Sequence, residues 1–415
     1  MAEQHEKALV PQIRFTGFTD PWEQRKLGEL ASKRIEKNTN GIKETFTNSA
    51  EHGVVSQLDY FDHDITNDAN IGNYSVVHPD DFIYNPRISA VAPCGPINRN
   101  KLDRNGVMSP LYTVFSVDDT IDKLYLEHYF KTSRWHQFMF LEGNSGARSD
   151  RFSISDSIFF EMPIQCPVLE EQELIASFFG RLDSLITLHQ RKYDKLCVLK
   201  KSMLDKMFPK GGSLYPEIRF AGFTDPWEQR KLEDYVVVST AKNVDGRFNK
   251  EDVLSVSGEY GIVNQIAFQG RSFAGSSVLN YGIVNTGDIV YTKSPLNSNP
   301  YGIIKVNKGI PGIVSTLYAV YRPQDNVHTN FIQVYFEQHE RMNNYMHPLV
   351  NKGAKNDMKV TAENALKGVV TFPSREEQVI ISEFFDRLDS LITLHQRKLE
   401  LLRNIKKSML DKMFV

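Results

Sequence analysis

Loops rich in Arg, Lys, Asn and Ser are the parts of this 415-residue sequence with the most evident binding chemistry. The first half contains Asn85, Arg87, Arg99, Asn100, Lys101, Arg104, Asn144, Ser145, Arg148 and Arg151, and the second half contains Lys293, Ser294, Asn297, Asn299, Tyr301, Lys352, Lys355, Asn356 and Lys359. Arg pairs with O6 and N7 of guanine, Asn pairs with N6 and N7 of adenine, and Lys or Ser suits phosphate. These residue types favour contacts with double-stranded DNA, whereas polar loops in general are more often only solvated.

Signatures of catalysis are absent from the sequence. It has no G-x-x-x-x-G-K-[ST] phosphate loop and no G-x-G-x-x-G motif after a strand. The segment Asn85-Pro-Arg-Ile88 superficially resembles the N-P-P-[YF] motif of adenine methyltransferases, but it lacks the second Pro and the aromatic residue that stacks on a flipped base. His128 with His136, and His339 with His347, have no third metal ligand near them. We therefore expect a non-catalytic chain with no cofactor or metal of its own.

The charge is nearly balanced, with 49 Lys and Arg against 51 Asp and Glu and a formal net charge of -2. Residues 1–169 carry 17 basic and 23 acidic residues, and residues 209–373 carry 17 and 15. Tight DNA binding requires many neutralised phosphates. A DNA-reading role would therefore need a concentrated basic patch, or a partner that supplies positive charge.

The three Cys residues lie too far apart for a metal knuckle and are odd in number, which excludes a disulfide framework. No apolar run has the length of a secretion signal or a bilayer span. These features predict a soluble protein of the cytoplasm.

The elements that must position the polar loops are given by an internal repeat. Residues 13–27 (IRFTGFTDPWEQRKL) recur at 218–232 with fourteen of fifteen positions the same. The segments RLDSLITLHQRK (181–192) and KKSMLDKMF (200–208) recur unchanged 206 residues later. The chain is thus two copies of one unit of about 200 residues, with a linker over 209–217.

Each copy begins with short β-type runs and a few helical stretches, which predicts a mixed α/β or α+β domain over 1–169 and again over 218–373. Each copy ends in a segment without Pro, over 170–208 and 374–415, which predicts a very long helix. Apolar residues in these segments are spaced four and three apart, as in a coiled coil.

Polar residues interrupt the apolar spacing at the same places in both helices, His189 with Lys192 and His395 with Lys398. Equal interruptions favour one alignment of the two helices against each other. Such pairing would make the helices antiparallel and the two domains pseudo-two-fold related. The alternative is that each helix is amphipathic and lies on its own domain surface.

The order of these features resembles the specificity subunit of type I restriction–modification enzymes over nearly the whole chain. The marks are a Trp-x-x-x-x-Leu entry to each domain, a G-V-M-S-P-L-Y-like strand, a Gly-containing basic loop, and a Pro-x-x-x-Glu-Gln junction at Pro167 and Pro373. The resemblance implies that each domain is a target-recognition domain reading one half of a bipartite DNA sequence.

The resemblance also implies partners. The long helices would space the domains and dock two methylation subunits, with Phe178, Phe179, Phe384 and Phe385 as candidate contacts, and restriction subunits would join for cleavage. S-adenosylmethionine, ATP and Mg would belong to those partner subunits. A rival from another class is a coiled-coil scaffold whose end domains bind protein or small ligands without recognising DNA.

Overall fold

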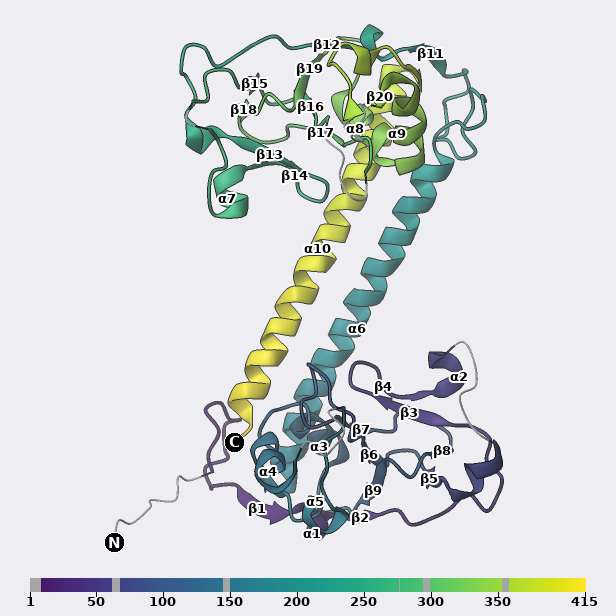
Figure 1. Cartoon of the computed structure of the whole chain (residues 1–415), viewed down its shortest axis with the longest axis vertical. Coiled ribbons are helices and arrows are strands. Elements are labelled where there is room, and N and C mark those ends of the chain that lie inside the picture. The colour runs from purple at the N-terminus through teal and green to yellow at the C-terminus, as the bar shows by residue number, and fades with distance from the viewer. Residues whose placement is uncertain (1–8, 62–67, 145–149, 276, 294–298, 353–357) are drawn as a thin grey trace. The chain divides into compact units, whose positions relative to one another are not determined.

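A computed structural model describes residues 9–61, 68–144, 150–275, 277–293 and 299–352, and then 358–415. The chain divides into two compact units. Unit 1 comprises Met1–Gln190 and Arg397–Val415, and unit 2 comprises Arg191–Gln396. Two long helices, α6 (Leu169–Lys206) and α10 (Arg375–Met413), each contribute one half to either unit (Figure 1).

Unit 1 contains short strands and short helices besides its halves of α6 and α10. The strands are β1 (Glu23–Lys26), β2 (Ala31–Lys33), β3 (Phe46–Ser49), β4 (Gly53–Ser56), β5 (Ser75–Val77), β6 (Phe82–Tyr84), β7 (Ile97–Arg99), β8 (Gly106–Met108), β9 (Thr113–Val117) and β10 (Pro163–Cys166). The helices are α1 (Leu27–Leu30), α2 (Gln57–Tyr60), α3 (Lys123–Tyr129), α4 (His136–Glu142), α5 (Asp156–Phe159) and the 3-10 helix η1 (Asp68–Asn73).

Unit 2 repeats this order with small differences. Its strands are β11 (Glu228–Lys231), β12 (Val236–Val238), β13 (Leu254–Ser257), β14 (Gly261–Asn264), β15 (Gly282–Val284), β16 (Ile289–Tyr291), β17 (Ile304–Val306), β18 (Gly312–Val314), β19 (Ala319–Pro323), β20 (Asn351–Lys352), β21 (Met358–Lys359) and β22 (Val369–Phe372). Its helices are α7 (Gln265–Gln269), α8 (Thr329–Glu337), α9 (His339–Met346) and the 3-10 helices η2 (Leu232–Asp234), η3 (Lys250–Asp252), η4 (His347–Leu349) and η5 (Asn364–Leu366).

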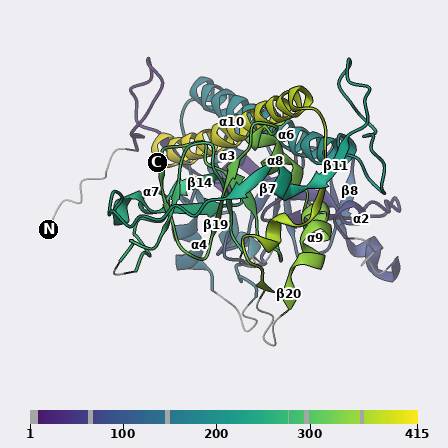
Figure 2. The same ribbon diagram turned by 90° about the horizontal axis from the view of Figure 1, so that it is seen from above.

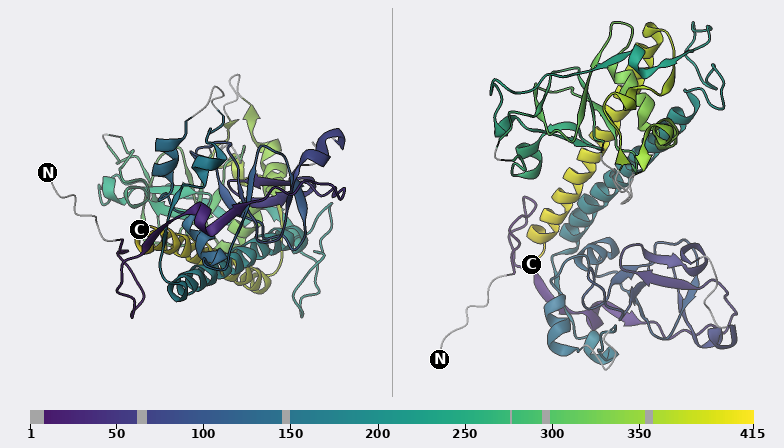
Figure 3. Two further views of the ribbon diagram at one scale, coloured as in Figure 1. Left: turned by 90° about the horizontal axis from the view of Figure 1, so that it is seen from below. Right: turned by 45° about the horizontal axis from the view of Figure 1, so that its top comes forward.

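The sheets of the two units have the same topology. A four-stranded antiparallel sheet has the order β2-β9-β6-β7 in unit 1 and β12-β19-β16-β17 in unit 2. Strand pairs β3-β4, β5-β8 and β1-β10 in unit 1 correspond to β13-β14, β15-β18 and β11-β22 in unit 2. In unit 1, the strands β3, β4, β5 and β8 lie away from α6 (Figures 1 and 3). The repeated sequence thus produces a repeated fold, with α3 or α8 between the sheet and the long helices.

The halves of α6 and α10 pack side by side in each unit (Figure 2). In unit 1, Lys406 of α10 forms a 2.5 Å ion pair with Asp183 of α6, and Arg403 of α10 donates a 3.0 Å hydrogen bond to Gln190 of α6. Residue numbers rise along α6 as they fall along α10, so the helices run antiparallel. Leu182 and Leu185 both belong to the predicted four-and-three spacing of apolar residues on α6. Leu182 is buried in the core, whereas Leu185 is exposed.

The end of each repeat anchors a long helix in an aromatic core. Phe414, just after α10, lies among Trp22, Tyr125 and Phe179 of unit 1, with ring centroids 5.4 to 6.3 Å apart. Phe208, just after α6, lies among the corresponding rings of unit 2: Trp227, Phe331, Tyr335 and Phe385. Burial of such rings accounts for the recurrence of KKSMLDKMF and of the Trp entry motif.

The junction before each helix fixes the segment that enters the domain. Arg14 forms two hydrogen bonds, of 2.7 and 2.8 Å, with the buried carboxylate of Glu171. Arg219 makes the same two-fold contact with Glu377 in unit 2, at 2.8 Å for both bonds. Bidentate pairs of this kind are strong and directional. The Glu of the Glu-Gln motif therefore holds the start of each repeat against the start of its long helix, about 157 residues later.

The expected fold class is confirmed: mixed α+β, two similar domains, and two long antiparallel helices. The helices begin at Leu169 and Arg375 and end at Lys206 and Met413, against expected spans of 170–208 and 374–415.

Candidate nucleic-acid interface

Two polar loops of unit 1 meet at one surface. Arg87 and Arg151 pair across an isolated antiparallel bridge, and a second bridge joins Asn144 to Ser153. Residues directly opposite each other in such a bridge project on the same side. The Arg87 side chain is exposed, and the Nε of Arg151 is buried with no hydrogen-bond partner in the described part of the chain. Arg87, Asn144 and Arg151 therefore lie together at these two bridges and are called the rim below.

Asn85 builds this rim from inside the fold. Its side-chain amide is buried and donates a 2.8 Å hydrogen bond to the Asn48 carbonyl, while its side-chain oxygen accepts a 3.0 Å bond from the Arg87 backbone. The loop passes so closely that a Cβ on Gly95 would lie 2.0 Å from the Asn85 carbonyl oxygen. Asn85 positions Arg87, and its buried amide donates and accepts hydrogen bonds within the domain.

Arg99 and Asn100 lie at the other end of the same strand pair. The register pairs Tyr84 with Ile97 and Phe82 with Arg99, which places Arg99 about 7 Å along the strand from Tyr84, the last residue of β6 before the Arg87 loop. Arg99 forms ion pairs with Asp80 and Glu127, and Asn100 is completely buried. The structure thus separates these two residues from Arg87 and Arg151.

Lys101 and Arg104 also have acidic partners. Lys101 pairs with Glu127 at 2.5 Å, and Arg104 pairs with Glu44 at 3.1 Å. Burial would raise the pKa of Glu127, but Lys101 and Arg99 outweigh burial, so its pKa is lowered and it stays ionised. In unit 1 the cations over residues 99–104 therefore neutralise the domain's own carboxylates.

In unit 2 the expected contact residues lie in two segments, 293–301 and 352–359. Lys293 has left-handed backbone (φ 43°), and its ammonium donates a 3.4 Å hydrogen bond to the Thr316 carbonyl. Desolvation and nearby Lys242 lower the pKa of Lys293. Tyr301 packs against the unit 2 core with its ring edge toward His347, 6.3 Å between centroids.

Lys352 and Lys359 lie in the paired strands β20 and β21, which bracket residues 353–357 as the Asn144–Ser153 bridge brackets 145–149 in unit 1. Both loops precede the long helices. Asn299 follows the first unit 2 segment and takes part in the fold through its backbone carbonyl, which accepts from Gly302 at 2.9 Å. Some of the expected contacts lie outside the described residues: Ser145, Arg148, Ser294, Asn297, Lys355 and Asn356.

The expected partner-binding phenylalanines lie at or in the cores. Phe179 and Phe385 are completely buried. Phe178 and Phe384 are partly buried under the entry segments, with ring centroids 6.2 Å from Phe15 and 5.8 Å from Phe220 respectively. In each repeat, the second of the two Phe residues is a core residue. The first contacts the segment that enters the domain, residues 13–27 or 218–232, which is called the strap below.

A second surface is the repeated leucine stripe, defined here as Leu185 and Leu188 of α6 and Leu391 and Leu394 of α10. The four-and-three spacing predicted Leu185 and Leu391 in the seam between the helices, whereas the structure leaves both exposed. The four side chains are between 43% and 47% exposed. All four lie in the identical segment RLDSLITLHQRK, so the same apolar surface occurs twice. The sequence feature that could have identified this surface is a Leu that occurs on a long helix outside the part packed against a domain.

No group of His, Cys, Asp and Glu suited to a metal occurs among the residues that the structure describes. In the same residues, none of the helices is long and apolar enough to span a membrane.

Comparisons with known proteins show which family the chain resembles. A family model, described as type I restriction modification DNA specificity domain, matches residues 19–197 and 224–404. A putative type I restriction enzyme MjaX specificity subunit of Methanocaldococcus jannaschii is 22% identical over 306 residues, which are 69% of this chain and 65% of that relative. The chain thus spans slightly less than two thirds of that relative's length.

Solved structures are similar over almost the full length. The crystal structure of the type I restriction–modification system S subunit from M. genitalium has a TM-score of 0.59 at 13% identity, with 98% of this chain and 99% of that chain covered. The HsdS subunit from Thermoanaerobacter tengcongensis has a TM-score of 0.41 at 16% identity, with 96% and 98% covered. The first of these likenesses supports the fold. Because the family model matches both repeats and most of the sequence, the chain belongs to the family of type I restriction modification DNA specificity domains, with one domain in each repeat.

Proposed function

We propose that this chain is the DNA specificity subunit of a type I restriction–modification complex. It reads a bipartite double-stranded target and directs the other subunits to it, and it performs no chemistry itself. Residues 1–169 and 218–373 are the two target-recognition domains. Residues 170–208 and 374–415 are the spacer helices, and 209–217 is the linker.

The observation that carries this proposal is the contrast within the repeat. The helical segments 181–192 and 387–398 are identical, as are 200–208 and 406–414, whereas the polar loops of the two domains differ. Two copies of one partner need two equal docking surfaces. Two different half-sites need two different reading surfaces.

The proposed DNA contacts come from the polar residues of the loops. They are centred on the Arg87–Arg151 bridge of unit 1 and on the strand pair β20–β21 of unit 2. Arg87, Asn144 and Arg151 are the described unit 1 side chains best suited to a base edge or phosphate, since Asn85, Arg99, Asn100 and Lys101 are engaged within the domain. Base contacts specify the sequence, and phosphate contacts position the domain.

The proposed partners are two methylation subunits and, for cleavage, restriction subunits. S-adenosylmethionine, ATP and Mg act in those subunits. The complex works in the bacterial cytoplasm, where it meets chromosomal DNA.

The test is exchange of one domain. A complex of this chain with its methylation subunits is expected to methylate one bipartite sequence, which methylome sequencing of cells with and without the chain identifies. Replacement of residues 13–166 by the corresponding segment of a relative should change one half of that sequence and leave the other half unchanged, because each domain reads alone. A change in both halves, or no preference for the mapped duplex over a scrambled one in a gel shift, contradicts the proposal.

Docking of the methylation subunits is proposed for the leucine stripe, with Phe178 and Phe384 beneath the adjoining straps. Burial of exposed apolar side chains against a partner stabilises the complex through the hydrophobic effect. Leu188→Asp together with Leu394→Asp should lower the pull-down of methylation subunit at least tenfold and leave the melting temperature unchanged.

The matched control is Val198→Asp. Val198 is 69% exposed on α6, and its repeat counterpart is Asn404, so it is not part of a surface that occurs twice. The control should retain assembly. Equal losses in both variants would show that docking does not use the stripe.

A further inference from the structure

A basic pocket lies in unit 1 where α10 passes the segment between α3 and α4. The cavity has a volume of about 800 Å³. Its cations are Lys131, Arg134, Arg403, Lys406 and Lys407. The remaining lining residues are Thr132, Ser133, Asn404, Ser408, Leu410 and Asp411. The pocket therefore has five cations against one carboxylate.

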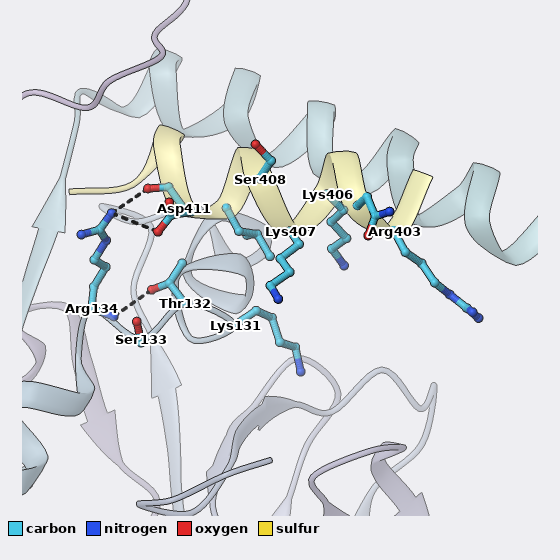
Figure 4. Close-up of a pocket in the computed structure, with 11 residues that line it drawn as sticks. Lys131, Thr132, Ser133, Arg134, Arg403, Lys406, Lys407, Ser408 and Asp411 are labelled. Carbon is cyan, nitrogen blue, oxygen red and sulfur yellow. Dashed lines mark hydrogen bonds and ion pairs between the residues drawn. The ribbon is translucent and has the colours of Figure 1, made fainter. Parts of the chain in front are cut away.

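Only part of this positive charge is neutralised. Arg134 donates a 2.6 Å hydrogen bond to the Asp411 carbonyl and lies 4.0 Å from its carboxylate, and Lys406 pairs with Asp183. Lys407 is exposed and has no carboxylate within ion-pair distance in the described part of the chain. Figure 4 shows Lys406 and Lys407 extending from α10 toward the segment that carries Lys131.

We propose that this pocket binds backbone phosphates of the DNA, outside the bases that unit 1 reads. The proposal rests on the proposed function and adds a second, sequence-independent contact to it. The overall charge of residues 1–169 is acidic, so DNA binding by this domain needs a concentrated patch. The patch arises only in the folded chain, because α10 supplies Arg403, Lys406 and Lys407 from the far end of the sequence.

The lining favours phosphate over a docked protein segment. Ten of the eleven side chains are polar or charged, and Leu410 is the one aliphatic residue among them. Arg, Lys, Ser, Thr and Asn are side chains that contact DNA phosphates, whereas Lys and Ser are depleted from the centres of protein interfaces. An apolar surface is present separately, as the leucine stripe.

The position of the pocket also suits DNA held by the reading loops. Helix α4 is seven residues long and joins the pocket segment, which ends near Arg134, to Asn144 of the rim. Seven residues rise about 10 Å. The pocket and Asn144 therefore lie near opposite ends of one short helix, a separation that a single duplex can span since it rises about 3.4 Å per base pair.

The corresponding place in unit 2 has a different charge. The repeat offset of 206 places Glu337, Glu340 and Cys197 where unit 1 has Lys131, Arg134 and Arg403, while Lys201 corresponds to Lys407. Carboxylates at two of these places repel phosphate. The phosphate contact is therefore a property of unit 1 alone, and unit 2 supplies a matched control.

The experiment measures the salt dependence of DNA binding by the complex of this chain with its methylation subunits. The variant combines Lys131→Ala, Arg403→Ala and Lys407→Ala. All three residues are exposed overall, and the Lys131 ammonium also donates a hydrogen bond to the side-chain oxygen of Asn98, which is a neutral partner. Fluorescence anisotropy is recorded on the mapped target duplex and on a scrambled duplex, over about 50 to 200 mM KCl. The slope of log K against log salt should fall in magnitude by about 2 to 3, with equal weakening on both duplexes, since each phosphate contributes about 0.9.

Two controls define the result. Lys201→Ala should leave the slope unchanged, and Lys131→Arg with Arg403→Lys and Lys407→Arg should retain the wild-type slope because the charges remain. An unchanged slope in the triple Ala variant overturns the inference, as does a loss of methylation-subunit binding without a change of slope, which would assign the pocket to an acidic protein segment. If the wild-type complex does not prefer its target duplex, the proposed function fails, and the slope still decides whether the pocket contacts phosphate.

Discussion

The two units use the same helix residues but surround them differently. Lys406 with Asp183 in unit 1 and Lys200 with Asp389 in unit 2 are equivalent ion pairs, each 2.5 Å long and each joining α6 to α10. In unit 2, Lys200 has a second carboxylate, Glu337, at 2.6 Å. In unit 1, the residue at the position of Glu337 is Lys131.

The comparison shows that the domain determines the electrostatics of an otherwise constant helix. Lys200 is only 15% exposed. Burial alone would lower its pKa, but Glu337 and Asp389 outweigh burial and raise it. Next to Glu337 the sheet of unit 2 has the buried cation Lys305, where unit 1 has Asn98. In unit 2 the lysine therefore lies between two carboxylates that a second, buried cation also approaches, whereas in unit 1 the equivalent lysine adds to a basic pocket.

The largest expected difference between the units concerns stability. Lys200→Ala leaves the Glu337 and Asp389 carboxylates next to each other with Lys305 still nearby, and should lower the free energy of unfolding by about 2 kcal/mol. Lys406→Ala leaves only Asp183, which is 38% exposed and can be hydrated, and should cost about 1 kcal/mol. Urea unfolding of the two single variants measures both values.

A Lys131→Glu substitution makes this part of unit 1 resemble unit 2, where Glu337 is the equivalent residue. In a Lys131→Glu background, Lys406 would face two carboxylates, so Lys406→Ala should then cost more than in the wild-type chain. Equal costs for Lys200→Ala and Lys406→Ala, with no effect of the Lys131→Glu background, would show that the surrounding domains do not set the energy of these pairs.

The repeated parts of the fold could be predicted from sequence because identity at a fixed offset reports shared structure directly. The segments around Trp22 and Trp227, and the KKSMLDKMF ends, meet in equivalent aromatic cores. The helix bounds followed from the absence of Pro over 170–208 and 374–415. In the structure, the Ser374 hydroxyl accepts a 3.4 Å hydrogen bond from the Glu377 backbone at the start of α10.

The candidate site was less accessible to sequence reasoning. Polar residue type does not distinguish a side chain that reaches solvent from one that satisfies the domain's own buried groups. Asn100 is completely buried, and Arg99 is held by two carboxylates, whereas Arg87 is exposed. The basic pocket was not visible at all, since residues 131–134 and 403–411 are adjacent only after α10 packs onto unit 1.

A smaller difference between the units lies at His128, three residues before Lys131 in the sequence. His128 is buried on α3, with its ring centroid 5.1 Å from that of Phe179 and no hydrogen-bond partner for either ring nitrogen among the described residues. The equivalent residue of α8 is Val334. Unit 1 therefore has a titratable group where unit 2 has an aliphatic one.

This difference should make unit 1 lose stability in mild acid. Burial and the charge of Lys406 lower the pKa of His128 from 6.5 to about 4, against the smaller opposing effects of Asp183 and Glu127; Lys101 also lowers it. A histidine with a lowered folded pKa binds its proton more readily when unfolded, so the folded state is favoured above pH 6.5 and loses that advantage as the pH falls toward 4. For these two pKa values the loss between about pH 7 and about pH 5 is about 2 kcal/mol. His128→Val, which copies unit 2, should remove that part of the pH dependence while retaining the apolar packing against Phe179. The measurement is the free energy of unfolding in urea at the two pH values for both proteins, and equal pH dependence would show that His128 is already solvated or paired in the folded chain.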